Sequence, residues 1–501
     1  MANLLYDALI APHATNTAPF LIGDDGRSLN YADFVQRAAR IANVLTAQGV
    51  RPGDRVVAQV PKVADAVALY AGAVQAGAVY LPLNTGYTQA ELAYFIADAA
   101  PKVVVCDSRD AGALRPLCPD GAALLTLGAD GRGTLSAAAD AAPGHFTTVP
   151  RGPDDLAGLL YTSGTTGRSK GAMMTHRNLL SNAQALTDLW RITAQDRLIH
   201  ALPIFHTHGL FVALNTSLLA GAQVRLMAGL QPDAVIAELP QATLMMGVPT
   251  FYTRLLADAR LTAALCSQMR LFISGSAPLL AETHDAFAAR TGHKILERYG
   301  MTETNMITSN PYDGARVAGT VGFALPGTEV VITDPATGAP LPQGEVGMIE
   351  VRGPNVFSGY WNMPDKTRED LRETGFFITG DLGVADGDGR ISIVGRMKDL
   401  IIAGGYNIYP KEVEDAINAV AGVLESAVFG VPDADLGEQV VAAVVLEAGI
   451  ALAPADIAAQ VAATLARFKQ PRRYVLLDAL PRNTMGKVQK NVLRRDHGGL
   501  R

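Results

Sequence analysis

The sequence predicts a mixed α/β protein, with a large N-terminal domain and a small, mobile α+β domain at the C-terminal end. Two observations lead to this prediction. Up to residue 330, apolar runs typical of buried strands alternate with helical patterns, as they do in an α/β domain. The chain also has 501 residues. Because one domain usually holds roughly 100–200 residues, more than one hydrophobic core is expected.

In the N-terminal part, five apolar runs have the length of buried strands. They cover residues 55–60, 102–107, 197–204, 244–247 and 271–275. A longer apolar stretch, residues 66–83, contains Gln75 and many small residues. We expect it to be a packed helix that runs into a strand, and not a membrane span.

A small β-rich subdomain is predicted for residues 321–395, where the pattern changes to short strands separated by turns. The last domain is predicted to alternate strands and helices again, and about 100 residues are enough to fold alone. Its expected helices cover 410–420 and 454–468, and its expected strands cover 425–430, 439–446 and 473–477. The predicted domains are therefore residues 1–396 and 397–501, with a boundary near residues 396–399 that need not be rigid.

Composition excludes several classes of protein. Hydrophobic residues make up 49% and charged residues 18% of the chain, which is not the composition of a disordered protein. The net charge of −6 does not indicate a nucleic-acid binder. Three scattered cysteines and no secretory leader indicate a reducing, cytoplasmic setting, and we expect no membrane partner.

The strongest chemical signal is a loop rich in glycine and hydroxyl groups, which ends in a lysine. It reads YTSGTTGRSKG over residues 161–171, between an apolar run and a helix that Thr175 can cap. Glycines let the backbone approach an anion, and hydroxyls and a lysine add donors and charge, so a triphosphate site is predicted. It is not a Walker A loop, because only two residues separate Gly164 from Gly167. The alternative is a flexible surface linker.

Two further motifs carry groups that suit a nucleotide. Residues 297–304 read ERYGMTET, where Tyr299 is suited to cover a base, Thr302 to bind a phosphate and Glu303 to hold Mg²⁺. Asp381 follows a glycine and suits the two hydroxyls of a ribose. Taken alone, the first motif would be a capped turn and Asp381 a turn residue.

Two motifs lie in or next to the small domain. Residues 395–410 combine charged residues with a Gly404-Gly405 loop at the domain boundary, where a pivot would present different faces of the small domain. Residues 481–487, reading PRNTMGK, place Lys487 on a glycine-containing turn. Either motif alone is a weak signal.

In this order, the five motifs resemble those of the acyl-CoA synthetase, adenylation-domain and firefly-luciferase superfamily. The resemblance runs from residue 25 to 495 and so covers nearly the whole chain. One departure is Ser169, where the family more often has proline. The resemblance implies a two-step reaction with ATP, Mg²⁺ and coenzyme A, in which a carboxylate forms an acyl-adenylate and the thiol of coenzyme A then displaces AMP.

The resemblance also implies a role for each matching residue. Lys487 would bridge the attacking carboxylate and the α-phosphate, Thr302 would bind the α-phosphate, and Glu303 would hold the magnesium. Tyr299 would hold the adenine, Asp381 and Arg396 the ribose, and Lys398 would be the hinge that lets Gly404-Gly405-Tyr406 line a pantetheine tunnel. The β- and γ-phosphates would be cradled by Thr162, Ser163, Gly164, Thr165, Thr166, Gly167 and Lys170.

The acid is suggested by Arg254, which follows a strand in a segment that resembles the wall of the acyl pocket. A fatty-acid enzyme needs apolar walls, whereas a guanidinium can grip a second carboxylate in bidentate geometry. A structural salt bridge is the alternative for Arg254. His206 and His208 form an H-x-H pair that would point both rings one way on a strand, but no further zinc ligands flank them.

These segments resemble malonyl-CoA synthetases. By that resemblance, Arg254 would bind the distal carboxylate, aided by His206 and by Ser274 or Ser276. Thr207 and Met306 would limit the substituent at C2, which implies malonate, and methylmalonate as well. Three alternatives remain: another small acid, transfer of the acyl group to a carrier protein, or a nucleotide-binding regulator that has lost catalysis.

Overall fold

The computed structural model describes residues 3–162, 169–483 and 487–498. The fold is mixed α/β, as predicted. The chain forms two compact units, of which the first comprises Met1–Val330 and Val351–Phe377 and the second comprises Val331–Glu350 and Ile378–Arg501. About half of the β-rich segment therefore groups with the C-terminal residues, whereas the sequence suggests a boundary near Lys398. The boundary at Lys398 remains a prediction.

The first unit contains a six-stranded sheet in the order β6-β5-β3-β4-β7-β8, which is parallel except for the antiparallel pair β7 and β8. Helices α4 (Gln89–Ala99) and α5 (Ala111–Leu114) contribute to the hydrophobic cluster on one face of this sheet. The strands are β3 (Arg55–Gln59), β4 (Val79–Pro82), β5 (Val103–Cys106), β6 (Ala123–Thr126), β7 (Leu156–Thr162) and β8 (Lys170–Thr175). Their short, almost wholly apolar sequences suit strands buried on both faces.

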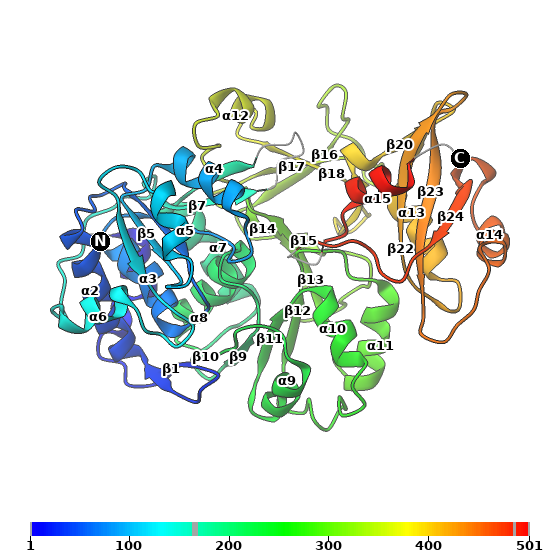
Figure 1. Ribbon diagram of the computed structural model, residues 1–501. Helices are drawn as coiled ribbons and strands as arrows, with labels where there is room; N and C mark the ends of the chain where they lie inside the picture. Colours follow the sequence, from blue (N-terminus) through cyan, green and yellow to red (C-terminus); the bar gives the residue numbers. More distant parts are fainter. Residues whose placement is uncertain (1–2, 163–168, 484–486, 499–501) are drawn as a thin grey trace. The chain divides into compact units, whose positions relative to one another are not determined.

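A nine-stranded sheet in the order β15-β14-β13-β12-β11-β9-β10-β1-β2 forms the rest of this unit's framework (Figure 1). Its six central strands are parallel, and β2, β14 and β15 are antiparallel to their neighbours. The strands are β1 (Pro19–Ile22), β2 (Ser28–Asn30), β9 (Arg197–His200), β10 (Gln223–Leu226), β11 (Leu244–Gly247), β12 (Leu271–Ser274), β13 (Leu296–Met301), β14 (Asn305–Ser309) and β15 (Phe323–Ala324).

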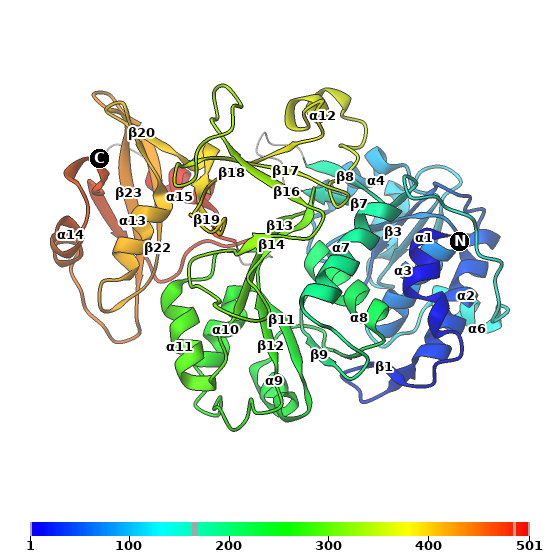
Figure 2. The same cartoon turned by 180° about the vertical axis from the view of Figure 1, so that it is seen from behind.

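Helices α7 (His176–Leu189) and α8 (Asn215–Ala220) pack against each other and lie between the two sheets (Figure 2). Thr175 caps α7 through a capping box with Asn178, which confirms the predicted start of this helix. The other helices of the first unit are α1 (Leu4–Leu9), α2 (Tyr31–Ala47), α3 (Ala64–Gln75), α6 (Thr134–Ala141), α9 (Pro232–Glu238), α10 (Pro249–Leu256), α11 (Ala281–Thr291) and α12 (Pro364–Asp370).

A four-stranded sheet, β16-β17-β18-β19, corresponds to the predicted β-rich segment. Its strands are β16 (Glu329–Thr333), β17 (Gly347–Arg352), β18 (Phe377–Ala385) and β19 (Ile391–Arg396). The short strands expected between residues 321 and 395 are therefore present. Strand β18 contains Asp381, so the expectation of a turn aspartate is wrong, because β18 continues past Gly380 and pairs with β19.

The C-terminal residues of the second unit form a five-stranded sheet in which β23 is central, flanked by β20 and β22 and also paired with β24. Its strands are β20 (Ile401–Ala403), β21 (Tyr406–Ile408), β22 (Val423–Asp433), β23 (Gly437–Leu446) and β24 (Arg473–Leu476). Side chains of this sheet form two hydrophobic clusters, and side chains from the helices of this part contribute to both. The helices are α13 (Pro410–Asn418), α14 (Pro454–Ala462) and α15 (Lys490–His497).

Two predicted elements end earlier in the structure than the sequence suggests. Strand β9 ends at His200, four residues before the predicted end, because the chain turns there into the irregular segment that precedes η3 (His208–Leu214). Helix α14 ends at Ala462 and not at residue 468. Residues 66–83 do form a helix and a strand, α3 and β4, and no helix in the described part of the chain is long and apolar enough to cross a membrane.

Candidate functional site

The predicted phosphate loop connects two antiparallel strands. Thr162, the last residue of β7, pairs with Lys170, the first residue of β8. The expectation that the loop leads from a strand directly into a helix is therefore wrong, because β8 comes before α7. Of the predicted loop residues, Ser163, Gly164, Thr165, Thr166 and Gly167 lie outside the described residues. The hairpin pairing places the remaining two, Thr162 and Lys170, side by side.

Lys170 and Glu303 are linked through Tyr360. The amine of Lys170 donates hydrogen bonds to the hydroxyl of Tyr360, at 3.0 Å, and to a carboxylate oxygen of Asp370, at 3.2 Å. The Tyr360 hydroxyl donates to Oε1 of Glu303, at 3.0 Å. Burial, together with these two carboxylates, raises the pKa of Tyr360, so its hydroxyl remains a donor. The structure thus joins two residues that lie in separate sequence motifs.

Glu303 suits a hard divalent cation. Its side chain lies in the turn between β13 and β14 and is only 5% exposed. Mg²⁺ prefers carboxylate, phosphate and water oxygens, and in proteins it usually takes one or two carboxylates with the rest of its shell from substrate and water. Thr302 precedes Glu303 in the same turn, and Tyr299 lies buried on β13. The residues predicted for the base, the α-phosphate and the metal therefore follow one another along one strand and its turn.

We expect the change Tyr360→Phe to weaken the binding of MgATP. The phenylalanine keeps the ring but removes the hydroxyl that orders both Lys170 and Glu303. Losing two such hydrogen bonds should cost about 1–3 kcal/mol and raise the KM for ATP by about 5- to 100-fold. Steady-state kinetics with varied MgATP measures this. Tyr87→Phe is the matched control, because the Tyr87 hydroxyl has no hydrogen bond to another described residue. An unchanged KM for ATP in Tyr360→Phe would contradict the proposed link.

A second group of polar side chains gathers around the ends of β12 and β13. Ser274, at the end of β12, is completely buried, and its hydroxyl has no hydrogen-bond partner among the described residues. The same holds for the hydroxyl of Thr207 and for Nε2 of His208. The Nδ1 atom of His208 lies 3.2 Å from the hydroxyl of Ser276. Burial and a neighbouring arginine, Arg298, hold the pKa of His208 well below its usual value, so this ring is neutral.

Arg298 is the residue that the sequence analysis missed. It lies on β13, is only 2% exposed, and its Nε and Nη2 atoms have no hydrogen-bond partner among the described residues. The guanidinium lies against Gly275, where an added Cβ atom would come within 2.5 Å of it. Burial lowers the pKa of Arg298 to about 9, so it is cationic at neutral pH. A buried cation with unused donors is costly unless an anion binds to it.

The other residues predicted for the acid lie near this group in the sequence or in the sheet. Met306 is buried on β14 and pairs with Gly300 of β13, and His206 is half-buried beside Phe205. Arg254 is exposed on the last turn of α10 and has no hydrogen bond or ion pair with another described residue. Arg298, and not Arg254, is the buried guanidinium with unused donors among the described residues.

The residues predicted for the ribose form an ion pair in the second unit. Asp381 and Arg396 are opposite each other on β18 and β19, and Nε of Arg396 lies 2.5 Å from Oδ1 of Asp381. The backbone N–H of Asp381 donates to the Thr379 hydroxyl, at 3.0 Å, which in turn donates to the carbonyl of Ile349, at 2.7 Å. The buried carboxylate of Asp381 is therefore held in a defined position.

Lys487 and the predicted hinge also lie in the second unit. The backbone N–H of Lys487 donates to Oδ1 of Asn483, and the N–H of Asn483 donates to the carbonyl of Lys487, both at 2.9 Å. These two bonds close a short loop and anchor the backbone of the exposed Lys487. Residues 484–486 lie outside the described residues. Lys398 is exposed in a short 3₁₀ turn after β19, and Gly404-Gly405 forms the turn of the hairpin β20–β21, with positive φ at both glycines.

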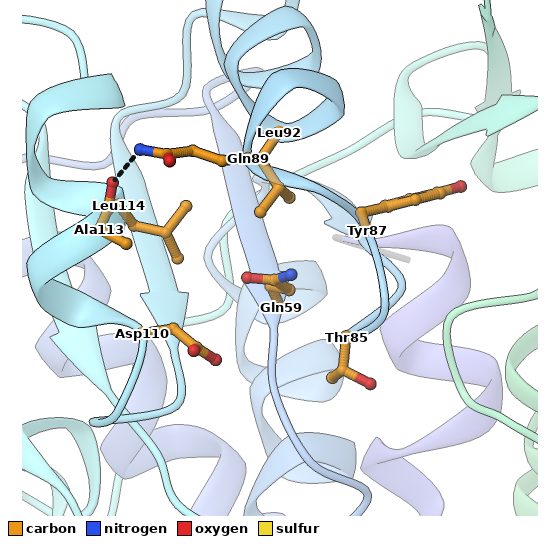
Figure 3. Close-up of a pocket in the computed structure, with 8 residues that line it drawn as sticks. All are labelled: Gln59, Thr85, Tyr87, Gln89, Leu92, Asp110, Ala113 and Leu114. Atoms are coloured by element: carbon orange, nitrogen blue, oxygen red, sulfur yellow. Dashed lines mark hydrogen bonds between the residues drawn. The ribbon is translucent and has the colours of Figure 1, made fainter.

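A separate cavity of about 150 Å³ opens at the carboxyl ends of β3 and β5 (Figure 3). Gln59, the last residue of β3, lies at its centre, between Asp110 and Thr85. None of the residues predicted to bind ATP or the acid lines this cavity. It therefore adds nothing to the site described above.

The zinc alternative depended on His206 and His208 sharing a strand. That expectation is wrong, because His206 lies in the turn after β9 and His208 begins η3. The imidazole of His208 is directed to Ser276. Within residues 3–162, 169–483 and 487–498, no group of three or more histidine, cysteine or acidic side chains could hold a metal ion.

The fold and the two groups of polar residues are those of a nucleotide-dependent enzyme, and comparison with known proteins establishes its class. Residues 11–361 match the family of AMP-binding enzymes, and residues 412–487 match the C-terminal domain of the same enzymes. The chain belongs to the AMP-binding enzyme family. The sequence-based assignment to this superfamily is confirmed.

Several relatives align over most of the chain. The crystal structure of ATP-bound MatB from Rhodopseudomonas palustris is 55% identical, with a TM-score of 0.97 and coverage of 99% of each chain. A feruloyl-CoA synthase from Amycolatopsis is 37% identical over 98% of this chain and 97% of its own length. A mitochondrial malonate–CoA ligase from Mus musculus is 36% identical over 83% of this chain and 77% of its own length.

Proposed function

We propose that this protein joins malonate, and methylmalonate as well, to coenzyme A in an ATP-dependent reaction through an acyl-adenylate. The observation that carries the choice of acid is the buried cation of Arg298, which has donors without a partner among the described residues and lies against Gly275, next to Ser274 in the chain. A dicarboxylate would leave one carboxylate free to react while the other neutralises this charge. The malonate–CoA ligase among the relatives supports the same acid.

In the first step, an oxygen of the reacting carboxylate attacks the α-phosphorus of ATP. A phosphorus–oxygen bond forms, the bond between the α- and β-phosphates breaks, and pyrophosphate leaves with the electron pair. We propose that Thr162 and Lys170, with the loop between them, bind the β- and γ-phosphates, and that Thr302 binds the α-phosphate. Glu303 would hold the Mg²⁺ ion, which neutralises phosphate charge when bound. Tyr299 would cover the adenine, and Asp381 and Arg396 would bind the ribose.

Lys487 is proposed to bridge the attacking carboxylate and the α-phosphate in this step. Charge builds up on the phosphoryl oxygens in the transition state, and a fixed ammonium stabilises it more there than in the ground state. The anchored backbone of Lys487 supports this role, because its side chain extends from a defined base. The proposed hinge at Lys398 would allow Lys487 to act in this step only.

In the second step, the sulfur of coenzyme A attacks the acyl carbonyl carbon. A carbon–sulfur bond forms, the carbon–oxygen bond to the phosphate breaks, AMP leaves, and the thiol proton is released. We propose that Gly404-Gly405-Tyr406 lines the path of the pantetheine arm. The turn of the β20–β21 hairpin is compatible with close approach of a ligand, because glycine adds no side chain.

The buried free thiols Cys106 and Cys266 support a cytoplasmic location.

A second candidate is the activation of another small acid. The relatives themselves differ in acid, since one is a feruloyl-CoA synthase. An aromatic acid such as ferulate would leave Arg298 without a counter-ion, so we favour the dicarboxylate. Transfer to a carrier protein in place of coenzyme A is the other alternative within the same chemistry.

A panel of acids tests the proposal directly. We expect ATP-dependent release of pyrophosphate with malonate and methylmalonate, and a kcat/KM for acetate, octanoate and ferulate at least about 100-fold lower, because only a diacid pairs with the buried cation. Thioester formation with coenzyme A and with a phosphopantetheinylated carrier protein identifies the acceptor. Equal rates with acetate and malonate would contradict the choice of acid. No pyrophosphate with any acid would indicate a regulator without catalysis.

A further inference from the structure

One buried amine next to the acid-binding residues has no role in the reaction described above. Lys62 lies in the short connection between β3 and α3. Its Nζ atom lies 2.7 Å from each of three acceptors: Nδ1 of His200, the carbonyl oxygen of His200 and the carbonyl oxygen of Leu202. A protonated amine has three donors, one for each of these acceptors. Burial holds the pKa of Lys62 well below its usual value.

His200 carries the contact further along the chain. It is the last residue of β9, it is buried, and its Nε2 atom lies 2.8 Å from the carbonyl oxygen of Gly209. Burial and the charge of Lys62 lower the pKa of His200 to about 3, so the ring is neutral. With Nδ1 accepting from Lys62, the proton must lie on Nε2, which donates to Gly209. The two ends of residues 200–209 are therefore tied together, with Lys62 bonded to one end.

The segment between these ties is the acid-binding loop, which we define as residues 201–208. It contains His206, Thr207 and His208. The Thr207 hydroxyl and Nε2 of His208 are buried and have no hydrogen-bond partner among the residues that the structure describes, and each such group costs about 1–3 kcal/mol. A loop left to itself would turn these groups toward water. Something outside the loop must hold them in place until a substrate binds.

Gly209 shows how closely the loop is packed at its far end. A Cβ atom there would lie 2.0 Å from the carbonyl oxygen of Pro203, so only glycine fits. At its near end the loop is continuous with β9, and the His200 carbonyl also accepts a hydrogen bond from the backbone N–H of Met227, at 3.0 Å. The carbonyls of residues 200 and 202 both point to the Lys62 amine. The amine is thus the only side-chain donor recorded for these two carbonyls in the described part of the chain.

We propose that Lys62, acting through His200, positions the acid-binding loop and thereby sets the affinity for the acid, without touching the acid, ATP or coenzyme A. This inference rests on the proposed function, because the acid is what the loop would bind. Lys62 is a positioning residue in this scheme. Its removal should disturb recognition of the acid and leave the ATP-binding groups around Lys170 and Glu303 unchanged.

The test is Lys62→Met, which keeps the length of the side chain and removes all three donors. We expect the KM for malonate to rise at least about tenfold, with the KM for ATP and for coenzyme A within twofold of the wild-type values. The ratio of kcat/KM for malonate to that for acetate should fall, because the misplaced loop no longer favours the diacid. Lys62→Arg, which retains several donors, should recover part of the loss. A matched control is Lys102→Met, since Lys102 makes a single long hydrogen bond, of 3.4 Å, to the carbonyl of Gly121.

A second variant, His200→Gln, removes the imidazole that connects Lys62 to Gly209. Its effect should resemble that of Lys62→Met, and the double variant should lose little more than either alone, because both act through one network. Equal changes in the KM for malonate and for ATP would overturn the proposal, as would additive losses. If Lys62→Met and His200→Gln both fail to fold, the network is structural and the proposal is wrong.

Failure of this inference can be told apart from failure of the proposed function. The wild-type enzyme identifies the preferred acid in the panel described above. If that acid is not malonate, the proposed function is wrong, and the same variants are then measured with the preferred acid. A selective rise in the KM for that acid would still support the role of Lys62, whereas a change confined to ATP would exclude it.

Discussion

Lys487→Ala should abolish formation of the acyl-adenylate and spare formation of the thioester. Removing one donor that stabilises developing charge lowers kcat by about 100- to 1,000-fold in comparable sites. Release of pyrophosphate from ATP and malonate should fall by at least this factor. The rate of thioester formation from preformed malonyl-AMP and coenzyme A should stay within threefold of the wild-type rate, because Lys487 is proposed to act in the first step alone.

Lys411→Ala is the control for this experiment. Lys411 also lies in the second unit, where it forms an ion pair with Asp415, one turn further along α13. Such a pair on a helix surface contributes only about 0.3–0.5 kcal/mol, so neither half-reaction should change. Equal loss of both half-reactions in Lys487→Ala, with Lys411→Ala unaffected, would instead show that Lys487 supports the fold of its loop.

The sequence predicted the strands and the capped helix well because those signals are local. Short apolar runs bounded by turn residues account for β3, β11 and β12, and the Thr175 capping box marks the start of α7 within one residue. Helix α15 was not predicted, because only Leu493 of its residues is buried, and it therefore lacks the apolar periodicity that marks a helix.

The predicted nucleotide motifs were found because their signals are also local. The residues that bind to these motifs in the structure were not found. Tyr360 and Asp370 lie about two hundred residues after Lys170 in the chain, and nothing in their own neighbourhood indicates a role. Their hydrogen bonds to the phosphate loop and to Glu303 depend on how α12 folds back beside β8. Contacts of this kind are set by tertiary structure.

Arg298 was overlooked in the sequence analysis, although the sequence around it contains a signal for a binding residue. It follows Glu297 in β13, and two consecutive charged residues in a buried strand are unusual. The motif around it drew attention to Tyr299, Thr302 and Glu303, which are predicted to bind the nucleotide. A charged residue inside a continuous buried run should itself have been treated as a candidate binding residue.

Arg298→Met should lower activity with malonate and at the same time stabilise the protein. Methionine fills a similar volume without charge, so the variant removes a buried cation whose Nε and Nη2 atoms have no hydrogen-bond partner among the described residues. Replacing such a charge by an apolar group is often stabilising by about 1–4 kcal/mol, and Tm should therefore rise. The bound diacid, however, would lose its partner, which should cost about 3–5 kcal/mol and lower kcat/KM for malonate by at least about 100-fold.

Activity with acetate distinguishes loss of the contact between Arg298 and the distal carboxylate from general damage to the protein. Acetate has no second carboxylate, so its kcat/KM in Arg298→Met should stay the same or rise. The comparison with Arg254→Ala then decides which arginine binds the distal carboxylate. Arg254 is exposed, so its loss should leave Tm unchanged, whereas the resemblance to malonyl-CoA synthetases implies a loss of about 2–4 kcal/mol in binding the diacid. If only Arg254→Ala loses malonate activity, Arg298 does not bind the distal carboxylate. If both variants lose malonate activity while only Arg298→Met gains stability, the two arginines share the carboxylate. The charge of Arg298 is then the one that destabilises the protein when no acid is bound.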